Sequence, residues 1–269
     1  TINDNDKPVR GTLQLNFTDV IDPSGSEKID RIEIWVDGSG YQGSATKVSE
    51  GVYKFDLDTE QFDDGNYTIR PSIFDMAGNR TRPFITITID NTPPVTPTAT
   101  LTANGISVLT NGYTSSEKFT FNLSSSEDTT RYQLKYWNNI PTSRFKENSP
   151  WNPTDLRSYS SELGVYNDKF TQGEGKHYFV FSACDMAGNC SGDSTPFVVT
   201  YDKTAPRSTI TSPSSGYITK ETPEIIGNTT DGYSVDKVVL SYTDYNMETL
   251  QCGETWTELK TIENQNKEI

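Results

Sequence analysis

The sequence predicts an all-β chain that folds as tandem β-sandwiches in an elongated array. Its 269 residues are rich in Thr, Ser, Asn, Asp, Gly, Tyr and Val, and only 32 % are hydrophobic, which suits short strands joined by polar turns. The chain also contains an internal repeat of about 100–110 residues, the length of one seven-stranded sandwich. Segments of alternating polarity recur at matching places in the repeats, as expected of half-buried strands.

The clearest repeated element is a turn-like hexapeptide that precedes an apolar strand. Residues 74–79 read Phe-Asp-Met-Ala-Gly-Asn, and residues 184–189 read Cys-Asp-Met-Ala-Gly-Asn. Each following strand leads into a link with proline, Asp-Asn-Thr-Pro-Pro at 90–94 and Asp-Lys-Thr-Ala-Pro at 202–206. We therefore divide the chain into the end of a preceding unit (1–8), domain 1 (9–92), domain 2 (93–204) and an incomplete domain 3 (205–269).

A strand at the same place in each domain predicts the core. Residues 31–36, 131–136 and 237–242 all alternate with period two. The side chains expected to face inward are Ile32, Ile34, Val36, Tyr132, Leu134, Tyr136, Val238, Leu240 and Tyr242. By the same parity, Trp35 is expected to point outward. In domain 1 we expect strands near 11–18, 29–37, 53–58, 67–74 and 83–89.

The hexapeptide, its following strand and the Asp-x-Thr-Ala-Pro or Asp-Asn-Thr-Pro-Pro link resemble the bacterial immunoglobulin-like (Big-type) repeat domains of surface and adhesin proteins. The resemblance implies immunoglobulin-like β-sandwiches with a non-catalytic, structural or adhesive stalk function at the cell surface or outside the cell. The partners it implies are neighbouring immunoglobulin-like domains of the same longer chain and a surface protein or glycan receptor. The alternative is an accessory carbohydrate-binding region of a secreted multidomain hydrolase.

Charge and motifs exclude several other functions. The net charge of −14 argues against nucleic acid, and no apolar run approaches the ~18 residues that membrane insertion needs. The chain has no hydrolase or phosphate-loop signature, and its one histidine, His177, is expected to be a packing residue, so we predict no enzyme activity. The glycine pattern at 38–43 resembles a dinucleotide motif, but a strand follows instead of a helix, which favours a hairpin loop.

Cys184 and Cys190 flank the turn of the second hexapeptide and predict a disulfide. Cross-strand Cα atoms lie about 4.5–5.5 Å apart, within disulfide range. Phe74 and Arg80 stand at the matching positions of domain 1, so both cysteines are absent there together. The alternative is a reduced pair or a metal site, whereas a disulfide would indicate an oxidising compartment. We expect the partner of Cys252 to lie beyond residue 269.

Domain 2 carries about ten extra residues within 138–156, and insertions on a sandwich often carry recognition. The predicted ligand-binding residues there are Trp137, Trp151 and Tyr159, which could present aromatic rings to a glycan. The alternative is an insertion that folds back and covers the sheet with its own aromatic side chains.

Carboxylates are expected to gather at the domain junctions, where they could hold Ca²⁺, the only cofactor predicted. In such a sandwich the last hairpin lies beside the incoming link, which places Asp185 near Asp90. The predicted calcium ligands are Asp4, Asp6, Asp75, Asp90, Asp128 and Asp185, with Asp19, Asp22 and Glu127 in neighbouring loops. The alternative is that Asp75 and Asp185 only accept backbone N–H bonds within their own turns.

Overall fold

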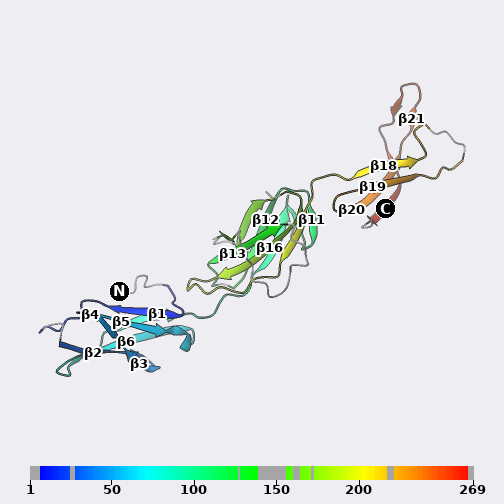
Figure 1. Ribbon diagram of the computed structural model, residues 1–269. Helices are drawn as coiled ribbons and strands as arrows, with labels where there is room; N and C mark the ends of the chain where they lie inside the picture. The colour runs from blue at the N-terminus through cyan, green and yellow to red at the C-terminus, as the bar shows by residue number, and fades with distance from the viewer. Residues whose placement is uncertain are drawn as a thin grey trace.

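The computed structural model describes residues 7–24, 28–126, 128–138, 156–159, 164–170, 173–216 and 221–265. This part of the chain is built of β-strands with one short 3-10 helix, and it has no helix long and apolar enough to cross a membrane. Every strand pairing described links strands within 12–89, within 98–201 or within 207–265. Figure 1 shows these segments as three successive lobes.

Domain 1 consists of two sheets that face each other across one core. The first has the order β1 (Thr12–Phe17), β5 (Val52–Asp58), β4 (Thr46–Ser49). The second has the order β3 (Gly40–Ser44), β2 (Ile29–Val36), β6 (Gly65–Asp75), with β7 (Arg80–Thr81) and β8 (Ile85–Ile89) both paired to β6. The helix η2 (Thr59–Gln61) follows β5. The five predicted strands are present, and β3, β4 and β7 are additional.

The core of domain 1 forms as the period-two pattern predicts. Ile32, Ile34 and Val36 are completely or almost completely buried, in contact with residues of the opposite sheet such as Leu57. The glycine pattern at 38–43 is a hairpin between β2 and β3, as predicted. A side chain at Gly43 would place its Cβ 2.8 Å from the ring of Phe55, so glycine allows this close approach of strand and core.

Domain 2 has the same two-sheet architecture, with four strands in one sheet and five in the other. One sheet has the order β10 (Ile106–Val108), β9 (Thr98–Ala103), β12 (Lys118–Ser124), β15 (Val165–Lys169). The other has the order β11 (Gly112–Thr114), β17 (Phe197–Tyr201), β16 (Gly175–Cys184), β13 (Arg131–Asn138), β14 (Leu156–Tyr159), with β11 parallel to β17. The chain crosses from one sheet to the other several times, for example from β12 to β13 and from β15 to β16, as in immunoglobulin-like sandwiches.

Phenylalanines fill the core of domain 2. Phe121 packs edge-on against Phe181 with ring centroids 5.0 Å apart and is completely buried. Tyr132 and Leu134 are buried as predicted, and Tyr136 is partly buried at the edge of the same cluster. These rings join the two sheets into one core, so the sandwich does not depend on its neighbours for burial.

The described residues of domain 3 form three strand pairs and no buried core. The pairs are β18 (Arg207–Ser212) with β19 (Ile226–Thr230), β20 (Val235–Tyr242) with β23 (Thr257–Gln265), and β21 (Tyr245–Asn246) with β22 (Gln251–Cys252). Of the described residues in this segment, none is buried. The expectation that Tyr242 faces a core is wrong, because its ring is 54 % exposed, and Val238 and Leu240 of the same strand are only partly buried among the described residues.

Candidate functional site

The repeated hexapeptide forms the same side-chain-stabilised turn in both domains. In domain 1 the Oδ1 atom of Asp75 accepts the backbone N–H groups of Ala77 and Asn79 at 2.9 and 2.8 Å. Its Oδ2 atom accepts the side-chain amide of Asn79 at 2.7 Å. These bonds lower the pKa of Asp75, the amide of Asn79 having the largest effect. They explain why the turn needs Asp and Asn four residues apart.

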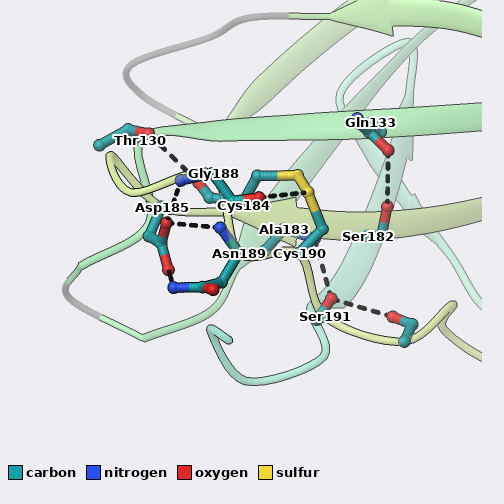
Figure 2. Close-up of a disulfide and its surroundings, with 11 residues drawn as sticks. Thr130, Gln133, Ser182, Ala183, Cys184, Asp185, Gly188, Asn189, Cys190 and Ser191 are labelled. Atoms are coloured by element: carbon teal, nitrogen blue, oxygen red, sulfur yellow. Dashed lines mark hydrogen bonds between the residues drawn. A yellow bond between two sulfur atoms is a disulfide. The ribbon is translucent and has the colours of Figure 1, made fainter. Parts of the chain in front are cut away.

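The turn of domain 2 adds a disulfide. Cys184 and Cys190 are bonded, with Cα atoms 4.1 Å apart, which confirms the predicted pair (Figure 2). Between them Asp185 accepts the backbone N–H groups of Gly188 at 2.7 Å and Asn189 at 2.9 Å. Asp185 is 4 % exposed, so this carboxylate is buried together with its donors.

The turn of domain 2 also contacts the link from domain 1. The side-chain amide of Asn189 donates to Asp185 Oδ2 at 2.9 Å and to the backbone carbonyl of Asp90 at 2.8 Å. The side-chain amide of Asn189 therefore connects Asp185 with Asp90. The guanidinium of Arg10 in domain 1 lies close to Gly188, where a side chain Cβ would be 3.5 Å from its Nε atom.

The carboxylates of this first junction repel one another. Burial raises the pKa of Asp90, and the charges of Asp185, Asp64 and Asp128 raise it further, while the N–H of Thr92 opposes the shift. Asp185 and Asp90 lie close enough to share the side-chain amide of Asn189. Likewise, the charge of Asp75 raises the pKa of Asp22, although hydrogen bonds from Ser24 lower it more.

A carboxylate of the preceding domain also holds each link. Asp64 accepts the backbone N–H of Asn91 at 2.6 Å and the hydroxyl of Thr92. At the second junction Glu174 accepts the backbone N–H of Lys203 at 3.0 Å and the hydroxyl of Thr204 at 2.9 Å. We call this arrangement the link clamp.

Sequence analysis missed the role of Asp64 and Glu174. Each acid stands directly before the glycine that opens the long strand β6 or β16, a position the two domains share. The threonine that each one binds is likewise the third residue of the Asp-x-Thr link. These two recurring positions are the signal that could have revealed the clamp.

The second junction repeats the charge crowding of the first. Burial raises the pKa of Asp202, and Asp231, Glu174 and a hydrogen bond shared with Asp231 raise it further. Asp231 lies in the loop after β19, the place that Asp128 occupies after β12. Asp231 also accepts the backbone N–H of Tyr233 at 2.8 Å. Both links therefore begin with an aspartate that is protonated more readily than usual.

The calcium prediction is not tested by this arrangement. Asp4 and Asp6 lie outside the described residues. Among the described residues, no group of three or more His, Cys, Asp or Glu side chains has an arrangement that would hold a metal ion. At the first junction the amide of Asn189 lies between the carboxylates of Asp185 and Asp90, at 2.9 Å from the first and 3.4 Å from the second.

The predicted aromatic ligand site of domain 2 falls largely outside the described part of the chain. Trp151 is not described, and of Trp137 and Tyr159 only the backbone in β13 and β14 is described. Strand β14 pairs with β13, so the insertion leaves and returns to this edge of the sheet. Ligand binding by these aromatic residues therefore stays a prediction.

His177 is a completely buried packing residue, as predicted. Its Nδ1 lies 2.7 Å from the hydroxyl of Tyr136, and its Nε2 lies 3.0 Å from the carbonyl of Gly173. Because only Nε2–H can donate to a carbonyl, the neutral ring accepts the tyrosine proton at Nδ1. Burial lowers the pKa of this imidazole. The ring is therefore buried with both of its nitrogens hydrogen-bonded inside domain 2.

Comparisons with known proteins assign no family. No family model matches the chain, and no curated protein matches it. Among solved structures, the FN1–FN3 domains of chicken CNTN1 are 11 % identical, with a TM-score of 0.44, covering 72 % of this chain and 65 % of that one. A tetra-tandem repeat from the extending region of a large adhesion protein is 16 % identical, with a TM-score of 0.29, covering 97 % and 64 %. The chain spans less than two thirds of each. At these scores the fold assignment rests on strand order alone.

Proposed function

We propose that the chain is a non-catalytic, semi-rigid spacer within an extracellular or cell-surface protein. The observation that carries this proposal is the link clamp, which recurs at both junctions with Asp64 in one and Glu174 in the other. Because the link clamp fixes the path of the chain where it leaves a domain, it favours domains held at a set spacing over domains that move freely. Prolines in both links support it, because proline fixes φ and limits bending.

The disulfide supports the location. Disulfides persist in oxidising compartments and are rare in the cytosol. The bond between Cys184 and Cys190 therefore favours a protein exposed outside the cell. Sequence patterns of catalysis are absent, and the one histidine is buried and fully hydrogen-bonded. The proposed role is accordingly to hold other parts of a surface protein at a set distance.

Small-angle X-ray scattering of the full chain tests the spacer role. Replacing both clamp acids, Asp64→Ala with Glu174→Ala, is expected to lower the average radius of gyration and broaden the distance distribution. Asp63→Ala is the matched control, because this exposed neighbour of Asp64 does not contribute to the clamp. Identical scattering of the native chain and the double variant would contradict the proposal.

A further inference from the structure

A row of aromatic and arginine side chains crosses the outward face of the second sheet of domain 1. Tyr41 of β3 packs against Trp35 of β2, with ring centroids 5.6 Å apart. Trp35 is opposite Arg70 of β6, and the guanidinium of Arg70 lies 5.1 Å from the ring of Phe84, the residue before β8. This aromatic row crosses four neighbouring strands and therefore spans about 14 Å.

A second group of side chains extends the same face along β6. The ring of Phe74 has the guanidinium of Arg31 at 3.9 Å and that of Arg80 at 5.9 Å from its centroid. Between this group and the aromatic row lies Ser72, on the same side of β6 as Arg70 by strand alternation. Ser72 is 1 % exposed, and its hydroxyl has no hydrogen-bond partner in the described part of the chain.

Donors and acceptors alternate beside these rings. The Nε atom of Arg70 contacts both carboxylate oxygens of Asp37, at 2.9 and 2.8 Å. Glu33 accepts the Nε atom of Arg31 at 2.8 Å and the indole N–H of Trp35 at 3.3 Å. Paired guanidinium and carboxylate groups leave this face close to neutral, although the chain carries a net charge of −14.

We propose that this outward face binds a neutral polysaccharide. The faces of aromatic rings are electronegative and attract the C–H groups of a sugar ring, while planar guanidinium and carboxylate groups match the donors and acceptors of hydroxyls. An acidic polymer would meet the carboxylates of this face and the negative charge of the chain. The rings at the two ends of the row, Tyr41 and Phe84, are 52 % and 66 % exposed, so an extended polymer can reach both of them.

Affinity gel electrophoresis of the full chain tests the proposal, with hydroxyethylcellulose, galactomannan and glycogen as neutral probes and alginate as the acidic one. We expect at least one neutral polysaccharide to retard the protein. Tyr41→Ala with Phe84→Ala should weaken that binding by about tenfold or more, because both stacking rings are lost. Phe84→Tyr keeps the ring and should retain binding. Tyr113→Ala is the control, since this ring is 54 % exposed in domain 2, away from the face.

Three results would overturn the proposal. They are no retardation by any neutral polysaccharide, retardation by alginate alone, and neutral binding that the Tyr41 and Phe84 double variant does not weaken. Melting curves establish that the variant is folded, which is expected because both side chains are largely exposed. The scattering test of the spacer role concerns other residues, so either proposal can fail without the other.

Discussion

The side-chain amide of Asn189 bonds the backbone carbonyl of Asp90 at 2.8 Å across the first domain junction. The same amide donates to the carboxylate of Asp185 within its own turn at 2.9 Å. The Asp–Asn bond of this turn recurs in both domains, and in domain 2 the same asparagine also makes a contact between domains. The function proposed for this chain depends on such contacts, which makes the junction residues the natural targets for experiments.

Replacing Asn189 should loosen the junction. Asn189→Ala leaves the buried carboxylate of Asp185 with one donor fewer, and we expect the free energy of unfolding of domain 2 to fall by about 1–3 kcal/mol. The control is Asn79→Ala in domain 1, because the side-chain amide of Asn79 bonds Asp75 within its own turn. Chemical denaturation measures both losses. A loss in N189A no larger than in N79A, with unchanged scattering, would show that the contact to Asp90 adds nothing.

Replacing Asp90 or Asp64 by asparagine should shift the melting temperature at pH 7 in opposite directions. The pKa of Asp90 is raised above 3.8, so its favourable contribution exists at low pH and is lost as pH rises through the folded-state pKa. Asp90→Asn should therefore raise the melting temperature at pH 7 in EDTA and have little effect near pH 3. The pKa of Asp64 is lowered by the bonds from Asn91 and Thr92, so its contribution is present at pH 7. Asp64→Asn should lower the melting temperature there.

Calcium at the junctions is a separate prediction from the sequence. A bound cation would offset the repulsion that raises the pKa of Asp90. We expect millimolar Ca²⁺ to raise the melting temperature relative to EDTA, and Asp90→Asn with Asp185→Asn to reduce this gain. Differential scanning calorimetry with Mg²⁺ as the control cation measures the effect. Superimposable curves in Ca²⁺ and EDTA would mean that these aspartates act only through hydrogen bonds.

Local patterns in the sequence predicted local structure well. The disulfide was predictable because Cys184 and Cys190 flank a five-residue turn. A turn this short brings the two flanking residues opposite each other, within disulfide distance. The buried set Ile32, Ile34 and Val36 follows from strand parity in the same way. In both cases the residues that decide the outcome are close neighbours in the chain.

Contacts between distant segments were harder to predict. Asp64 and Asn91 are separated by 27 positions, and their bond depends on where β6 begins relative to the outgoing link. Parity placed Tyr242 on the core side of β20, but burial also needs an opposing sheet, which the described residues of domain 3 do not supply. Strand alternation alone decides which face of a strand a side chain occupies, whereas its burial also depends on how the sheets of the domain pack.

Domain 3 should be the least protected part of the chain. None of its described residues is buried, and β20 pairs with β23 alone, whereas β2 and β13 each pair with two strands. Amides on strands without a core open locally at low free energy. In hydrogen exchange with mass spectrometry, peptides from 207–265 should exchange at least tenfold faster than peptides from β16, a difference of about 1.4 kcal/mol in opening free energy. Equal protection would show that domain 3 has a core.

His177 should make domain 2 sensitive to mild acid. Burial lowers its pKa below the ordinary value of 6.5, so the unfolded chain binds the proton more readily than the folded one. Stability from this residue is therefore complete above pH 6.5 and declines as the pH falls from there towards the folded-state pKa. Protonation would also place a second N–H against the hydroxyl of Tyr136, whose lone pairs can accept it only after the hydroxyl turns its own proton away. The melting temperature of domain 2 should fall between pH 7.5 and 5.5, and His177→Gln, which cannot titrate, should remove that slope even if it lowers the melting temperature throughout. A slope of the same size in H177Q would assign the acid sensitivity to the carboxylates of the junctions.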